Sequence, residues 1–483
     1  MKTILVRLFN LFSRKESITL VFVFIISLLL RINLAVKLPI WIDEAIVLNL
    51  SQNNNFYNLL SGNHWDASHP PLLHIITKLQ LFLINEKHIF LYRIFHITFF
   101  SFSIFPLYLV LKKIIRNSNA AFIGILLYST QSFILENTFT LRPYSIILFL
   151  FSVFLLIETN KVKLLKINYL IISNLLIIFS FYFDYSSLWF IIPFYIYRLI
   201  QIKNLKTFLI RFFPSIFIIS LWTPIFLQNF SQLQILNMYA KNISLFQFFE
   251  QIIGIVKFWD RSEPMGLFGY YIYLSIFLNS LLYIFKNKEI KYSISIYFIF
   301  PVLFIIIYSA ITTPAFIARQ FISLSLLSTI FIANLFKNKK YMNLLIAIIL
   351  LNIYQSITII PNFRYLSFTN HEKLIMNNSN TISLLYPYSD LDSIDYYLRT
   401  SGFIRDLSQY NPVIFKNDTK IIYAYPSEIE RLSDHNLVLI HGDIIHNNNY
   451  YKIIENECNL TKNEIDNLIY KNQSYIFYEC NIL

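Results

Sequence analysis

The sequence predicts a polytopic α-helical membrane protein with a small C-terminal α/β domain. Of its 483 residues, 56% are hydrophobic and only 14% are charged. The apolar residues form long runs that are separated by short basic clusters. A soluble domain carries roughly 25% charged residues. Most of this chain is therefore expected to lie in lipid.

The net charge of +13 first suggests a nucleic-acid partner, but its distribution argues against one. Lys and Arg fall mainly between apolar runs, which is the pattern that orients helices in a bilayer. The chain has no Gly-rich phosphate loop, no zinc-finger spacing and no long basic tail. We therefore expect a membrane-embedded protein that binds no nucleic acid.

The first apolar run extends from Ile18 to about Val36 and follows a basic amino terminus. A bilayer core of roughly 30 Å is crossed by about 20 residues, so this run is long enough to span it. It has no convincing small-residue cleavage site. We predict a retained first transmembrane helix with the amino terminus in the cytoplasm.

A polar loop, the first outer loop, is expected over residues 37–88. Within it, the stretch from Leu72 to Ile84 is too short and interrupted for a span, and it predicts an amphipathic helix lying in the interface. The second span is expected from about Ile89 to Leu111.

Further spans bring the expected total to about 11. They cover approximately residues 120–135, 141–158, 167–183, 186–202, 208–227, 266–285, 292–311, 319–336 and 341–360. Basic clusters recur at every second junction, so all of them fall on the cytoplasmic side. An odd number of spans puts the tail outside a cell membrane of bacterial type.

The chain is thus divided into a transmembrane domain, 1–360, and a soluble extracytoplasmic domain, 361–483. Three stretches of the tail predict strands, with helical stretches between them. They are Thr381–Tyr386, Lys420–Tyr425 and Asn436–Ile440. Cys458 and Cys480 both lie in this tail, and they form one disulfide in an oxidising compartment or remain free thiols.

The chemistry is expected in the first outer loop, where Asp43 and Glu44 stand directly after the first span. An acidic pair at a bilayer surface costs solvation free energy unless it meets a cation, a metal or a proton-donating substrate. Alternatively, the pair merely occupies the first turn of a helix, which acidic residues favour. About 25 residues later His69-Pro70-Pro71-Leu72 follows. This combination favours a catalytic interpretation.

These motifs resemble those of a known enzyme family. Trp41-Ile42-Asp43-Glu44-Ala45, then His69-Pro70-Pro71-Leu72, then the stretch from Asn85 to Arg93 resemble the GT-C fold glycosyltransferases. The most similar group is the protein O-mannosyltransferase and aminoarabinose transferase superfamily (family 39-like). The resemblance covers roughly residues 18–200. It implies a catalytic Asp in the first outer loop, a His-Pro-Pro motif that shapes the same loop, and an Arg that opens the second span.

Further positions follow from the resemblance. The stretch from Glu136 to Tyr144 is similar to an outer turn of the family that ends in an Arg and a Tyr. Glu136 is then a second acid and Arg142 a phosphate contact; alternatively both anchor the chain at the interface. Asp184 stands where relatives often have a His, which leaves its role open.

Two single residues complete the candidate substrate-binding set of His69, Glu136, Arg142, Tyr144 and Arg319. Arg319 resembles a late Arg motif and is a candidate contact for a carrier phosphate; the alternative is a side chain that snorkels to the interface. His69 binds a metal or hydrogen-bonds the donor, or it only caps the turn before the two prolines. The sequence predicts no certain cofactor and leaves a divalent metal open.

The resemblance and the topology together imply an inverting glycosyltransferase. It takes a sugar from a polyprenyl-phosphate-linked donor and passes it to a hydroxyl of a lipid, glycan or protein on the outer face of the membrane. Asp43 and Glu44 are the catalytic residues. The alternative is a transporter, flippase or polysaccharide polymerase, which predicts charged residues in mid-span or broken helices in matching halves. A membrane anchor for a receptor-like tail would leave both motifs without a purpose.

Overall fold

The computed structural model describes residues 13–38, 42–61, 70–84, 88–160, 166–236, 296–304 and 321–335, helical pieces between 346 and 357, and five strands after residue 403. The chain divides into two compact units. Unit 1 comprises Met1–Ala35, Asn54–Gln80 and Phe90–Ile359. Unit 2 comprises Val36–Asn53, Leu81–Ile89 and Ile360–Leu483.

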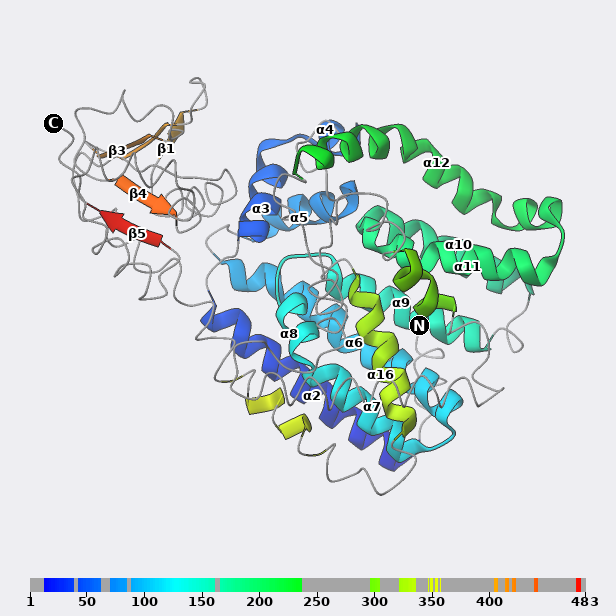
Figure 1. Ribbon diagram of the computed structural model, residues 1–483. Helices are drawn as coiled ribbons and strands as arrows, with labels where there is room; N and C mark the ends of the chain where they lie inside the picture. Colours follow the sequence, from blue (N-terminus) through cyan, green and yellow to red (C-terminus); the bar gives the residue numbers. More distant parts are fainter. Residues whose placement is uncertain are drawn as a thin grey trace. The chain divides into compact units, whose positions relative to one another are not determined.

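The described part of the chain is mostly helical (Figure 1). Its main helices are α2 (Arg14–Lys37), α3 (Ile42–Asn53), α4 (Phe56–Ser61), α5 (Pro71–Leu83), α6 (Ile89–Ile115), α7 (Ser118–Thr130), α8 (Ser132–Thr138), α9 (Tyr144–Asn160), α10 (Lys166–Phe183), α11 (Leu188–Ile202), α12 (Leu205–Leu236) and α16 (Ile322–Leu335). A 3₁₀ turn, η1 (Tyr185–Ser187), joins α10 to α11.

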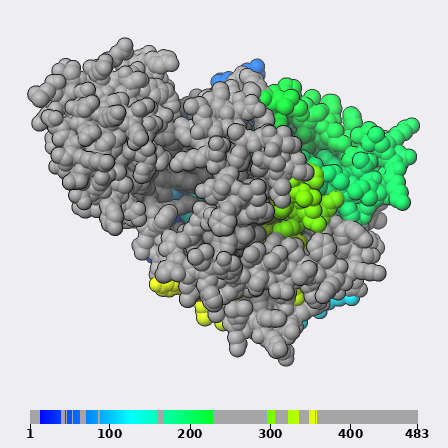
Figure 2. Space-filling view, in the orientation of Figure 1, coloured from blue at the N-terminus to red at the C-terminus, as the bar shows by residue number. Residues whose placement is uncertain are grey.

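Three described helices are long and apolar enough to cross a membrane: Arg14–Lys37, Ile89–Ile115 and Leu205–Leu227. Two of them contain the predicted first two spans, and the third contains the predicted span 208–227. Exposed apolar side chains follow one side of α12, among them Leu209, Phe213 and Phe217, and the outer surface of α12 is seen in green in Figure 2. These features are compatible with a helical membrane protein.

Two stretches differ from the sequence prediction. The expected span 120–135 is interrupted, since α7 and α8 are bent by 56° at Gln131, whose extended backbone (φ −56°, ψ 123°) cannot continue an α-helix. The stretch 37–88 is predicted as a loop, yet it contains α3, α4 and α5. Of these, α5 overlaps the stretch from Leu72 to Ile84 that is predicted as an amphipathic helix; it buries Leu73, His74 and Thr77 and exposes Phe82 and Leu83.

Contacts near the helix ends fix the directions within unit 1. Glu16, at the start of α2, contacts Tyr108 and Lys112 near the end of α6. Ala35, at the end of α2, accepts a hydrogen bond from Arg93 near the start of α6. The two helices are therefore antiparallel. We call the end of unit 1 near Arg93 the turn end and the end near Glu16 the ion-pair end.

The remaining helices run back and forth between these two ends. Lys113 on α6 donates to the carbonyl oxygen of Thr159, which places the end of α9 at the ion-pair end. Phe321, next to α16, packs on Trp189 at the start of α11, with ring centroids 4.4 Å apart. Further along α16, Ala333 faces Gly124 of α7. The hydrophobic core consists mainly of the buried faces of α6, α7, α9, α11 and α16.

The described part of the tail contains two antiparallel sheets. One has the order β1 (Ile404–Asp406), β2 (Val413–Lys416), β3 (Thr419–Ile422), and the other pairs β4 (Val438–His441) with β5 (Tyr475–Tyr478). Two predicted strands, Lys420–Tyr425 and Asn436–Ile440, overlap β3 and β4. The predicted strand Thr381–Tyr386 and both cysteines lie outside the described residues.

Candidate functional site

The turn end of unit 1 gathers buried polar groups on α2, α6 and the turn between α8 and α9. Three buried arginines belong to it: Arg31, Arg93 and Arg142. A guanidinium group in apolar surroundings is costly to bury, and it attracts carboxylates and phosphates. The turn end is therefore the candidate site of unit 1.

Arg31 lies in the last third of α2 and is completely buried. Its Nε donates to Thr138 Oγ1 at 2.8 Å, and its Nη1 donates to the carbonyl oxygen of Ser129 at 3.1 Å. The same Nη1 also donates to the carbonyl oxygen and the hydroxyl of Ser27. The guanidinium lies 3.5 Å from the centroid of the Phe100 ring. All of these partners are uncharged.

Arg93 and His96 lie one turn apart on α6. Arg93 Nη1 donates to the carbonyl oxygen of Ala35 at 2.8 Å, and its guanidinium is 5.6 Å from the centroid of Phe139. His96 Nδ1 is 3.3 Å from the hydroxyl of Ser145 on α9. One face of α6 therefore lies against the start of the turn 139–143, at Phe139, and against Ser145 just after it.

This turn carries two of the predicted residues. Arg142 is buried within it, and its backbone N–H donates to the carbonyl oxygen of Thr140. Tyr144 is buried as the first residue of α9. Glu136 is half-buried on α8. The structure thus brings Arg142 and Tyr144 into the same turn region as Arg93 and His96.

Asp184 occupies the connection between α10 and α11. Its side chain accepts the backbone N–H of Ser186 at 2.6 Å and caps η1. The next residue, Tyr185, accepts a hydrogen bond from Trp222 Nε1 on α12. Asp184 therefore has a local capping role, which is a frequent use of Asp.

The predicted catalytic pair lies in unit 2. Asp43 and Glu44 fall in the first turn of α3, which begins at Ile42. Glu44 is completely buried, whereas the side chain of Asp43 lies outside the described part of the structure. Acidic residues in a first helical turn also interact favourably with the helix dipole. This position in the first turn of α3 is also the one expected if the acidic pair has only a structural role.

Two predicted site residues, His69 and Arg319, lie outside the described residues. Within the described parts of the chain, no group of three or more His, Cys, Asp or Glu side chains is arranged to hold a metal ion.

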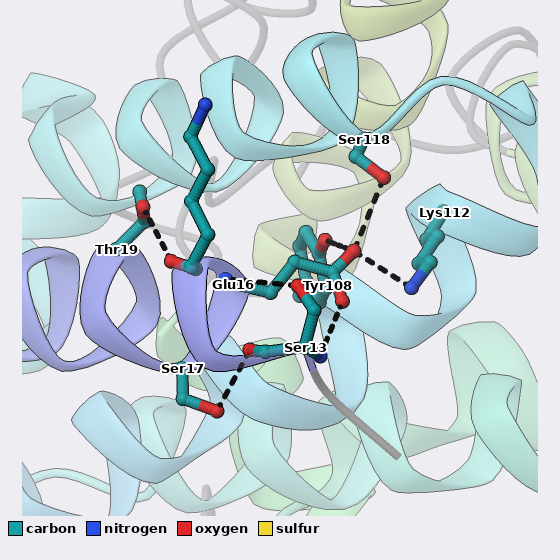
Figure 3. Close-up of polar contacts among 8 residues, drawn as sticks. Ser13, Glu16, Ser17, Thr19, Tyr108, Lys112 and Ser118 are labelled. Atoms are coloured by element: carbon teal, nitrogen blue, oxygen red, sulfur yellow. Dashed lines mark hydrogen bonds and ion pairs between the residues drawn. The ribbon is translucent and has the colours of Figure 1, made fainter.

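The ion-pair end differs in its chemistry. Glu16 closes a capping box with Ser13 at the start of α2, and Figure 3 shows how its carboxylate also meets Tyr108, Lys112 and Ser118. Nearby, Glu158 on α9 pairs with Arg198 on α11, and Tyr169 on α10 donates to the same carboxylate. Lys112 and Arg198 are thus each paired with a carboxylate, as in a structural ion pair.

Sequence reasoning missed Arg31 and His96 as site residues, and it mentioned Arg93 only as part of a motif. For Arg31 a signal was present, because it is the charged residue within the apolar run from Ile18 to Val36. His96 carried no such signal, since its position depends on how α6 packs against α9.

In comparisons with known proteins, no family model matches the chain, and no curated protein matches it.

Proposed function

We propose that this chain is a membrane glycosyltransferase that uses a polyprenyl-phosphate-linked sugar. One observation carries the proposal: an apolar helical unit buries three arginines at a single end, and two of them, Arg93 and Arg142, belong to sequence motifs that resemble the GT-C enzymes. Buried cations in apolar helices are costly and are usually kept for function. A lipid-linked phosphate is an anion that such groups recognise.

In this proposal Asp43 takes the proton of the acceptor hydroxyl, and Glu44 orients Asp43 or acts on a metal. The acceptor oxygen forms a bond to the anomeric carbon while the bond from that carbon to the phosphate oxygen breaks, so the configuration inverts. Arg142 and Arg319 stabilise the negative charge that develops on the departing polyprenyl phosphate. Glu136, Tyr144 and His69 contribute to binding of donor and acceptor.

The proposal places the reaction on the outer face of the cell membrane. No nucleotide sugar or ATP is available there, which favours a lipid-carried donor. The acceptor is a hydroxyl of a lipid, a glycan or a protein.

The test uses the full-length protein in liposomes with a panel of radiolabelled polyprenyl-phosphate sugars and membrane extracts as acceptors. The wild type is expected to transfer one of the sugars. Asp43→Asn is expected to lower transfer at least about 100-fold, as for loss of a general base. Asp66→Asn, a change of another acid in the same predicted loop, serves as the matched control. Equal transfer by wild type and Asp43→Asn would remove Asp43 as the base.

A transporter or flippase for lipid-linked glycans is the second candidate. It is favoured by the bent pair α7–α8 and by the buried pair Glu158–Arg198 between apolar helices, both of which are typical of transport proteins. Movement of an intact lipid-linked glycan across the liposome bilayer, without consumption of any donor, would support this candidate instead.

A further inference from the structure

Arg31 is an unusual residue to keep inside an apolar helix. It is completely buried, and every partner that the structure gives it is an uncharged oxygen or an aromatic ring. A well-packed apolar side chain at such a position avoids the cost of removing a charge from water. The cost must therefore be offset by something that this particular side chain does.

Two partners of Arg31, Ser129 and Thr138, lie on opposite sides of the bend between α7 and α8. Ser129 O belongs to the last turn of α7, where carbonyl groups lack intrahelical partners. Thr138 Oγ1 belongs to the last residue of α8, and it donates in turn to the carbonyl oxygen of Ile134. One guanidinium group therefore connects the ends of both helices.

Only arginine suits this arrangement. Its planar group presents donors in a rigid fork, whereas lysine offers a single point charge. The plane is held in place by Phe100, whose ring stacks on Tyr128 of α7 with centroids 4.9 Å apart. The orientation of the fork is thus supported by Phe100 of α6, which itself stacks on α7, the helix that one of the donors binds.

The bend leads directly into the turn 139–143. Thr138, which Arg31 binds, is followed by Phe139, on which Arg93 packs, and then by Arg142. We infer that Arg31 is a positioning residue: by joining the last turn of α7 to the end of α8, it fixes where the turn 139–143 places Arg142 and Tyr144. The role in donor binding rests on the function proposed above.

The first test does not depend on activity. Hydrogen–deuterium exchange of the full-length protein is compared for wild type, Arg31→Gln and Thr138→Val, with Tyr195→Phe as the control. Tyr195→Phe also removes one hydrogen bond between helices, a part-buried one to Ser215 that joins α11 and α12. We expect faster exchange in peptides covering residues 129–145 for the first two variants only. Unchanged exchange there in both would overturn the inference.

The second test is the dependence of transfer on donor concentration. Misplacing Arg142 and Tyr144 weakens donor binding, so the KM for the donor is expected to rise about tenfold in Arg31→Gln and less in Thr138→Val. A merely structural role would lower the amount of active protein and leave KM unchanged. In Arg31→Lys the donor KM is expected to rise less than in Arg31→Gln, because the lysine ammonium group reaches one of the two helices.

The outcomes separate the two proposals. If wild type transfers sugar and the donor KM is unchanged in both variants, the positioning role is overturned while the proposed function stands. If exchange at 129–145 rises but the wild type uses no donor, the positioning role is supported and the proposed function fails. If Arg31→Gln does not fold, the same two measurements, exchange at 129–145 and the donor KM, are made on Thr138→Val alone and decide the question.

Discussion

Arg198 and Arg31 are both buried between helices of unit 1, but different kinds of partner hold them. At the ion-pair end, Arg198 meets the carboxylate of Glu158, so the two charges cancel locally. At the turn end, Arg31 meets hydroxyl and carbonyl oxygens of α2, α7 and α8. The matched pair joins α9 to α11, whereas Arg31 connects the ends of α7 and α8 through neutral partners. The two ends therefore combine similar residues for different purposes.

The largest effect is expected from breaking the matched pair. Glu158→Gln leaves Arg198 buried without its carboxylate, so we expect a loss of about 3–5 kcal/mol in the free energy of unfolding. Replacing both residues, Glu158→Leu with Arg198→Met, removes both charges and is expected to cost much less. Denaturation of the detergent-solubilised protein checks this. A double variant as unstable as Glu158→Gln would contradict the assignment of a simple compensated pair.

A smaller effect is expected between the two ends, where close packing rather than charge joins the helices. A Cβ added at Gly124 on α7 would lie 2.8 Å from the Cβ of Ala333 and 2.9 Å from Leu111 Cδ1. Gly124→Ala is therefore expected to lower stability by about 1–3 kcal/mol through overpacking. Adding Ala333→Gly is expected to restore part of this loss in the same denaturation measurement. If Gly124→Ala has no effect, the contact between α7 and α16 is looser than described.

Periodicity and length of apolar runs predicted much of the helical part. The runs 18–36, 167–183 and 186–202 fall within a few residues of α2, α10 and α11, because uninterrupted apolar sequence with basic flanks defines a helix locally. The bend at Gln131 could not be predicted in this way. Arg31, whose guanidinium contacts both sides of this bend, is about 100 residues away in the sequence and meets Ser129 only in the folded chain.

Part of the candidate site was also predictable, because some of its residues belong to a local sequence motif. Arg142 and Tyr144 were singled out through a local motif; Arg142 is buried within the turn 139–143, and Tyr144 is buried directly after it. Arg31 and His96 depend on contacts between distant helices, with Thr138 and Ser145 respectively. For Asp43, His69 and Arg319 the assigned roles stay predictions.

We propose that the turn end of unit 1 contributes Arg142 to the chemistry, whereas the ion-pair end only joins helices. The most direct measurement compares sugar transfer by Arg142→Gln with transfer by the double variant Glu158→Leu with Arg198→Met, using equal amounts of protein with the same gel-filtration profile. We expect at least a tenfold loss, about 1.4 kcal/mol or more of transition-state stabilisation, for Arg142→Gln. The double variant is expected to show near wild-type transfer. Full transfer by Arg142→Gln, or an equal loss in both proteins, would show that Arg142 has no special part in the reaction.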